Sequence, residues 1–304
     1  MNTEWICHGR IVWMAVVPMV LASLGGSRPA EGRQTPRGTL QTLIETEEGG
    51  EVPFTVVDGY LIVVEGRIGE RSRVKFALDT GATYSVLRAD LAKGLDTAHL
   101  PVRVVNLDKA LTQERVNVVD FQLGPRRISE LAMLKHDLGY LRASAPGVEG
   151  LIGLDVLRLK SFNIDFHRRK IRFGAQRLLR SSAPMEIDRS YLAVEVCLLD
   201  RPVHLLVDTG ARSILLYRDR VADRLPSVKV EQRIRGASLS GEASLEVVTL
   251  PRVQLNRTEL ERRAVLLRSS PAEFLPGVDG YLSLAALGAW RVSFDFERSQ
   301  LSWE

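Results

Sequence analysis

The sequence predicts a mostly-β protein built from two copies of one domain. The chain matches itself at a shift of about 130 residues, which is too long for a solenoid unit and suits a duplicated domain. Each copy contains short segments rich in β-branched and apolar residues around turn-like sequences, and few stretches of helical periodicity. We therefore expect two similar β lobes that carry only short helices.

Composition bounds the class of protein. The 304 residues are 45% hydrophobic and 26% charged, which predicts a folded body with room for two domains. The formal net charge is +4, and the basic residues are scattered rather than gathered in a block, so we expect no nucleic-acid partner. The two cysteines, Cys7 and Cys197, are too few for a disulfide framework or a four-cysteine zinc site.

The N-terminal segment has the pattern of an export signal. Residues 1–26 contain Arg10, an apolar run over residues 11–24, and then small residues. The run is short for a membrane span and Pro18 interrupts it, so we predict a cleaved signal peptide, with an uncleaved signal anchor as the alternative. Either alternative predicts an exported protein, periplasmic or secreted, which touches the membrane only if the segment stays attached. The composition of residues 27–52, which is rich in Gly, Arg, Thr and Glu, predicts a flexible spacer or a propeptide.

The repeat divides the rest of the chain. We assign residues 53–176 to a first lobe, residues 177–184 to a polar linker, and residues 185–304 to a second lobe. Four landmarks recur in the same order. They are Tyr60-Leu61 and Tyr191-Leu192; Leu78-Asp79-Thr80-Gly81-Ala82 and Val207-Asp208-Thr209-Gly210-Ala211; Gly150-Leu151-Ile152-Gly153-Leu154 and Gly280-Tyr281-Leu282-Ser283-Leu284; Ile164-Asp165-Phe166 and Phe294-Asp295-Phe296.

The elements of each copy follow from local pattern. Apolar, β-branched segments predict paired strands in each lobe, at residues 60–68, 74–78, 191–198 and 203–207. Longer alternating segments predict hairpins at residues 104–123 and 232–255. Helical periodicity predicts short helices at residues 87–95, 154–159, 216–225 and 284–287.

The repeated Asp-Thr-Gly string carries the chemistry. Asp79 and Asp208 each follow an apolar strand, where a carboxylate at the edge of a core needs a partner. One interpretation is two Asx-type turns that only cap local backbone. The functional interpretation is that a pseudo-twofold axis brings the two side chains face to face. Two carboxyl groups that lie about 3 Å apart share one proton. One of them then acts as a base and the other as an acid on a water molecule.

These motifs resemble those of the retropepsin-like aspartic proteases, and two copies in one chain is similar to the bilobed pepsin arrangement. The resemblance implies a bilobed acid-protease-like fold of two β-barrel lobes and an aspartic endopeptidase that uses no metal and no cofactor. It assigns catalysis to Asp79 and Asp208. It also implies that the active-site loops are built by Thr80, Gly81, Ala82, Thr209, Gly210 and Ala211, with the threonines bracing the loops across the axis and the glycines allowing their close approach.

A second motif of the family lies behind each loop. It maps onto Leu151-Ile152-Gly153 in the first copy and Tyr281-Leu282-Ser283 in the second. The second copy departs from the pattern, with Ser283 in place of Gly153 and Ala285 in place of Asp155. This departure leaves open a catalytically weak or inactive peptide-binding scaffold as the alternative function.

The hairpin segments predict flaps that close over an extended peptide or protein substrate. The flap candidates are Asn106, Leu107 and Asp108 within residues 106–113, and Gly236, Ala237 and Ser238 within residues 236–241. Ala82 and Ala211 stand where pepsins carry a hydroxyl residue, so we expect a mildly acidic to near-neutral pH optimum. We expect a monomer, with pairing of lobes between two chains as the alternative.

Overall fold

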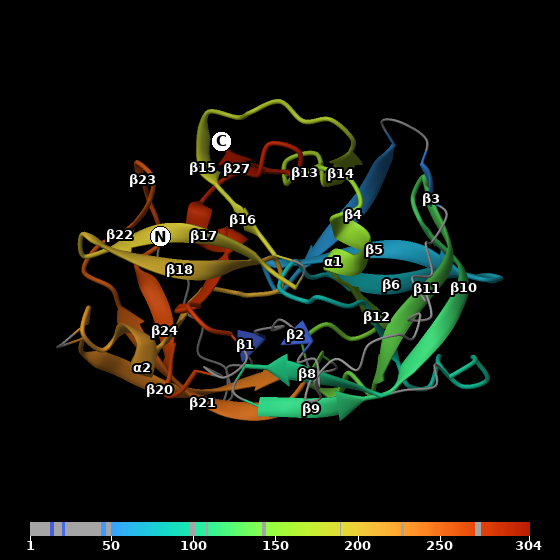
Figure 1. The fold of residues 1–304 in the computed structure, drawn as a ribbon, viewed down its shortest axis with the longest axis horizontal. Coiled ribbons are helices and arrows are strands. Elements are labelled where there is room, and N and C mark those ends of the chain that lie inside the picture. Colours follow the sequence, from blue (N-terminus) through green and yellow to red (C-terminus); the bar gives the residue numbers. More distant parts are fainter. Residues whose placement is uncertain are drawn as a thin grey trace, which may run out of the picture.

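The computed structural model describes residues 50–97, 101–107, 109–141, 144–188, 190–225, 228–270 and 275–304, and the backbone alone of residues 13–14, 20–21 and 44–46. Apart from the backbone of these three short strands, the predicted signal segment and the predicted spacer up to residue 49 lie outside the described residues. Figure 1 shows two β lobes side by side, the first in cyan and green and the second in yellow to red. Among the described residues, no helix is both long enough and apolar enough to cross a bilayer.

The first lobe is a closed barrel of six strands. Strand β10 pairs with β11 on one side and, through Phe121 and Ile68, with β5 on the other, which closes the sheet on itself. Side chains of β10 alternate between buried and more exposed, as a barrel wall requires. The strands are β5 (Leu61–Ile68), β6 (Arg71–Leu78), β7 (Val86–Arg88), β10 (Arg115–Leu123), β11 (Arg126–His136) and β12 (Gly150–Ile152).

The second lobe repeats the central pairings of the first. Strand β18 runs parallel to β25, β25 runs antiparallel to β19, and β19 runs parallel to β24. In the first lobe, β6 likewise runs parallel to β12, β12 antiparallel to β7, and β7 parallel to β11. The predicted duplication is therefore confirmed in the topology. The strands are β16 (Glu186–Ile187), β17 (Leu192–Leu198), β18 (Arg201–Asp208), β19 (Ile214–Tyr217), β22 (Val253–Leu255), β23 (Thr258–Glu259), β24 (Arg263–Leu267) and β25 (Gly280–Ser283).

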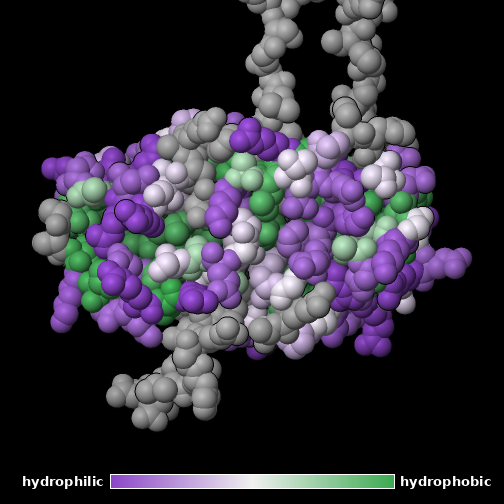
Figure 2. Space-filling model, turned by 90° about the horizontal axis from the view of Figure 1, so that it is seen from below, coloured by the Kyte–Doolittle hydropathy of each residue, from purple (hydrophilic) through white to green (hydrophobic). Residues whose placement is uncertain are grey.

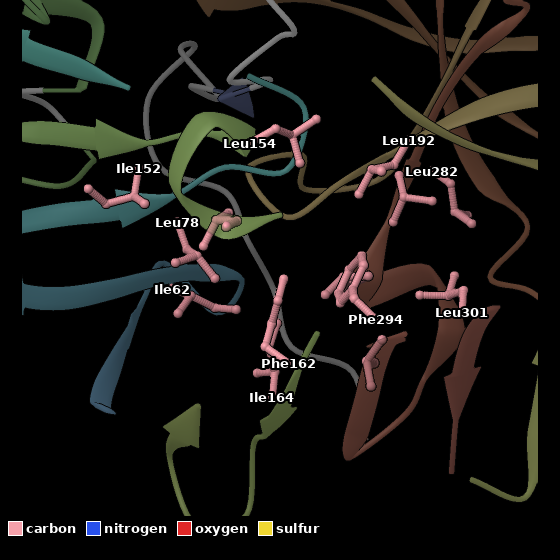
Figure 3. Packing of buried hydrophobic residues seen from close by; sticks show 14 of the residues in the cluster. Ile62, Leu78, Ile152, Leu154, Phe162, Ile164, Leu192, Leu282, Phe294 and Leu301 are labelled. Atoms are coloured by element: carbon pink, nitrogen blue, oxygen red, sulfur yellow. The ribbon is translucent and has the colours of Figure 1, made fainter. Parts of the chain in front are cut away.

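A sheet made by both lobes joins them. Its strands are β4 (Glu51–Val57), β14 (Lys170–Phe173), β13 (Phe162–Asp165), β26 (Arg291–Asp295), β27 (Gln300–Trp303) and β15 (Ser181–Pro184). Strands β13 and β26 carry the last repeated landmark and pair antiparallel, with the rings of Phe162 and Phe294 stacked 4.7 Å apart. Figure 3 shows these rings between Ile62 and Leu78 of the first lobe and Leu192 and Leu282 of the second. One apolar core therefore runs through both lobes.

One sequence prediction fails in the described structure, and one segment has more structure than its composition suggests. The helix expected at residues 87–95 is absent, because Arg88 and Ala89 direct their backbone amides to carbonyls of neighbouring segments, and turns follow. Within the predicted linker, residues 181–184 form strand β15, which pairs with β27. The helices that do form are short: α1 (Leu154–Leu157), α2 (Arg218–Val221) and the 3-10 helices Gly139–Leu141 and Leu284–Leu287.

Two hairpins project from the same side of the lobes. The first, flap 1, consists of β8 (Val102–Asn106) and β9 (Lys109–Gln113), and the second, flap 2, of β20 (Val230–Ser238) and β21 (Gly241–Thr249). Three further strands, β1 (Trp13–Met14), β2 (Val20–Leu21) and β3 (Ile44–Thr46), pair with β20, β8 and β11. Figure 2 looks onto the flap side, where hydrophilic residues cover much of the visible surface.

Candidate active site

The two aspartates lie at equivalent strand ends. Asp79 follows β6, and Asp208 is the last residue of β18. The amide of Gly81 donates to Asp79 Oδ1 at 2.9 Å, and the amide of Gly210 donates to Asp208 Oδ1 at 2.7 Å. Each carboxyl group is therefore oriented by an Asx-type turn in its own loop. These turns leave the second oxygen of each group for another role.

The threonines brace the two loops against each other. The amide of Thr80 donates to Thr209 Oγ1 at 2.9 Å, and the amide of Thr209 donates to Thr80 Oγ1 at 3.1 Å. The hydroxyl of Thr80 donates to the carbonyl of Val207, and that of Thr209 donates to the carbonyl of Leu78. Because all four bonds cross from one lobe to the other, they fix the separation of the two aspartate loops.

Gly81 allows the two carboxyl groups to approach each other. A Cβ atom placed on Gly81 would lie 2.6 Å from Asp208 Cγ, closer than real Cβ contacts. Asp79 and Asp208 are both fully buried, and the Oδ2 atom of each has no hydrogen-bond partner among the described residues. Two buried carboxyl oxygens thus lie at the junction of the lobes without a protein donor.

Burial and proximity change the acidity of the pair. Burial raises the pKa of Asp79 well above its usual range, and the charge of Asp208 raises it further. Burial likewise raises the pKa of Asp208, to about 7, against the opposing effect of the Gly210 amide. Two coupled carboxyl groups of this kind titrate as a unit and hold one proton between them over a wide pH range. The pair therefore contains a base and an acid at the same time.

Side chains behind the first loop hold it in place. Ser85 donates to Asp155 through its amide at 2.9 Å and through its hydroxyl at 2.7 Å, and the amide of Gly153 donates to Ser85 Oγ at 3.1 Å. Burial raises the pKa of Asp155 to about 6. Leu151 and Ile152 lie on β12, which pairs with β6 directly before Asp79. A Cβ atom on Gly153 would lie 2.6 Å from the carbonyl carbon of Tyr84, so glycine is required there.

The second lobe achieves the same support by different bonds. Tyr281 and Leu282 pair with β18 as their counterparts pair with β6. Ser283 has a φ of −72°, which any residue adopts without strain. Its hydroxyl donates to the carbonyl of Ala211 at 2.6 Å and accepts from the amide of Ala285 at 3.1 Å. In the first lobe the amide of Leu154 donates to the equivalent carbonyl, that of Ala82. The serine therefore supplies a brace where the glycine and aspartate are missing.

Replacing Ser283 by alanine tests this brace. We expect Ser283→Ala to lower the free energy of unfolding by about 1–3 kcal/mol, because a buried carbonyl and an amide lose their partner. Ser293→Ala is the matched control, since the Ser293 hydroxyl is buried with no hydrogen-bond partner in the described part of the chain and its removal should cost little. Thermal unfolding of the two variants checks the difference. Equal melting temperatures would contradict a bracing role for Ser283.

The flap tips meet and cross to the opposite lobes. Asn106 Oδ1 accepts from the hydroxyl of Ser240 at 3.0 Å, which links the two tips. Leu107 packs into the apolar cluster of the second lobe, and Leu239 packs into that of the first. Leu107 has a left-handed φ of 43°, and its carbonyl accepts from the Tyr217 hydroxyl at 2.9 Å. The two hairpin tips are therefore held together by contacts that cross between the lobes.

The predicted flap residues fall into three groups. Asn106 and Leu107 lie at the tip of flap 1, while Asp108 lies outside the described residues. Gly236, Ala237 and Ser238 lie on β20, next to the tip of flap 2 rather than at it. Sequence reasoning missed Ser85, Tyr217 and Leu239, because none of them belongs to a repeated motif and each acts through a partner far away in the chain.

The flap edges accept an extended chain. Residues 13–14 run parallel to residues 236–237 of β20, and residues 20–21 run antiparallel to residues 104–105 of β8. Figure 1 shows β1 and β2 between the flaps and the rest of the lobes. Because a twofold axis reverses strand direction, one peptide that crosses it must run parallel to one flap and antiparallel to the other. The edges of the two flaps thus suit strand addition by a single peptide.

The described part of the chain offers no cluster of three or more histidine, cysteine, aspartate or glutamate side chains suited to a metal ion.

Comparison with protein families gives a match to a family described as aspartyl protease, over residues 64–156 and again over residues 194–284. Each matched range contains one of the two aspartates, one aspartate loop and the motif behind it. No curated protein matches the chain.

Proposed function

Since the chain belongs to the aspartyl protease family, we propose that it is an endopeptidase that hydrolyses extended peptides with a water molecule activated by Asp79 and Asp208. The observation that carries this proposal is the cross-braced pair of buried carboxyl groups, one from each lobe. A protease domain acts on peptide substrate, and the pairing of both flap edges with extended backbone supports a groove for such a substrate.

The geometry suits general acid–base catalysis. Oδ1 of each aspartate is engaged by a loop amide, so the Oδ2 atoms are the groups left to act on water and substrate. The ionised carboxyl group takes a proton from water, which attacks the peptide carbonyl. The protonated carboxyl group donates to the carbonyl oxygen, and a proton then passes to the leaving amine. Flaps that close over the substrate exclude bulk water from this step.

The pH dependence follows from the raised pKa values. The active pair holds one proton, so activity falls when the pair gains a second proton at low pH and when it loses its last at high pH. Burial raises the pKa of both carboxyl groups, which moves the whole profile upwards. We expect kcat/KM to be highest at mildly acidic to near-neutral pH and to fall as the pH rises through about 7. A maximum below about pH 3 would contradict this assignment.

The direct test is cleavage of a mixed peptide library between about pH 3 and pH 8. The proposal predicts cleavage at bonds inside the peptides. Pepstatin, a peptide inhibitor of aspartic proteases, should suppress this cleavage. A protein that binds library peptides and cuts none at any pH would instead be a scaffold on this fold.

We also propose that the reaction takes place outside the cytoplasm, on the basis of the signal-like residues 1–26. N-terminal sequencing of protein recovered from the periplasm or medium tests this. A cytoplasmic protein with an intact N-terminus would contradict it.

A further inference from the structure

A tyrosine that belongs to no repeated motif lies in the first lobe near the aspartate pair. Tyr140 is part of the 3-10 helix Gly139–Leu141, which follows β11. Its side chain packs against the apolar cluster that contains Tyr60, Leu151 and the flap 2 residue Leu239. Tyr140 therefore packs against a cluster shared by the motif behind the first aspartate loop and the tip of flap 2.

The hydroxyl of Tyr140 is buried and has no hydrogen-bond partner among the described residues. An unpaired buried hydroxyl costs about 1–3 kcal/mol, so its presence calls for an explanation, and a role in binding or catalysis is one such explanation. The ring is fixed by an edge contact with His136, at 6.2 Å between centroids, and His136 Nδ1 accepts from the amide of Leu138 at 3.0 Å. The unpaired hydroxyl is therefore held in a defined direction.

The second lobe provides a contrast. There the hydroxyls of Tyr217 and Tyr281 lie 2.8 Å apart, and Tyr217 donates to the carbonyl of Leu107 in flap 1. Tyrosine hydroxyls in the second lobe are thus used within the protein, whereas the Tyr140 hydroxyl is not. In addition, Ala82 and Ala211 provide no hydroxyl beside the aspartates.

The electrostatic surroundings keep this group a donor. Burial raises the pKa of Tyr140 well above its usual range, and the charges of Asp79 and Asp208 raise it further. The hydroxyl therefore keeps its proton at every pH at which the pair is active.

We propose that the Tyr140 hydroxyl donates a hydrogen bond to a main-chain carbonyl of the bound peptide next to the bond that is cut. This inference rests on the proposed peptidase function and adds a substrate-binding residue to it. The peptide supplies the partner that the hydroxyl lacks in the described structure. Since any peptide offers main-chain carbonyls, the contact favours extended backbone rather than a particular side chain.

The test is Tyr140→Phe in the full chain, with kcat/KM for the best-cut library peptide and the melting temperature as readouts. We expect kcat/KM to fall about 10- to 100-fold, while the melting temperature stays equal or rises because an unpaired hydroxyl is removed. Tyr191→Phe is the matched control, since the Tyr191 hydroxyl donates to the exposed Glu186 at 3.1 Å and should leave both readouts unchanged.

The outcomes separate this inference from the proposed function. An active parent with an equally active Tyr140→Phe variant would overturn the inference alone. A variant that loses rate and melting temperature together would also overturn it, because that pattern indicates a structural role. A parent that cuts no peptide would remove the proposed function, and the inference with it.

Discussion

We expect Asp79→Asn and Asp208→Asn each to lower kcat/KM by about 10³-fold or more. The amide of Asn still accepts from the loop glycine through its oxygen, so the local turn is kept. It neither takes a proton from water nor donates one as a carboxyl group does. Because the two aspartates act as one unit, the double variant should be little worse than either single variant.

Stability should move in the opposite direction to activity in these variants. Two buried carboxyl groups with raised pKa values oppose folding at neutral pH, so removing one raises or preserves the melting temperature. Asp200→Asn is the control, because its carboxylate is 79% exposed and should affect neither readout. Kinetics at the optimum pH and thermal unfolding at neutral pH check the pair of expectations. Full activity of either active-site variant would contradict the assignment.

Gly81→Ala is the second large effect that we expect. The added methyl group would lie 2.6 Å from Asp208 Cγ and 2.9 Å from both of its oxygens. Relief requires either turning the Asp208 carboxyl group off the Gly210 amide or moving one aspartate loop away from the other, against the four threonine bonds that brace them. We expect kcat/KM to fall at least about 100-fold, since misplacement by about 1 Å is enough for such a loss. Overpacking also costs about 1–3 kcal/mol of stability.

Circular dichroism at the assay temperature separates these two consequences for Gly81→Ala. A variant that is folded and inactive supports the view that close approach of the carboxyl groups is what catalysis requires. A folded variant with the activity of the parent would show that the glycine has no such role.

The repeated motifs made the aspartate pair predictable from sequence. Asp-Thr-Gly occurs at equivalent places in both copies, and a duplicated domain brings equivalent residues to a common axis. The same argument places Thr80 opposite Thr209, where the structure has their reciprocal bonds. Repetition thus substitutes for long-range information that a single motif does not contain.

Contacts outside the repeat were not predictable. The Tyr217 hydroxyl and the Leu107 carbonyl lie 110 positions apart, and no pattern in the chain links them. Ser283 is a second example of a contact that the sequence does not reveal. Its departure from glycine suggested weaker support for the second loop, because a sequence does not show that the hydroxyl reaches the carbonyl of Ala211.

The error in the fold prediction, and the strand found within the predicted linker, have a similar origin. The helical periodicity of residues 87–95 was overridden where the chain pairs as β7 and the backbone of Arg88 and Ala89 bonds to neighbouring segments. Residues 181–184 have the polar composition of a linker, yet they form β15 because the edge of β27 is there to pair with. In both cases tertiary hydrogen bonding, which is not local, decided the structure.

The central claim is that one chain supplies both catalytic aspartates. Its most direct test is to measure the cleavage rate of an equimolar mixture of Asp79→Asn and Asp208→Asn chains. This rate is compared with that of the same total amount of parent protein. Lobes that pair within one chain predict an active parent and a mixture as inactive as either variant. Lobes that pair between chains would restore an intact site in mixed dimers, up to about a quarter of the parental rate. Activity in the mixture, or a parent that cuts nothing at any pH, would contradict the account.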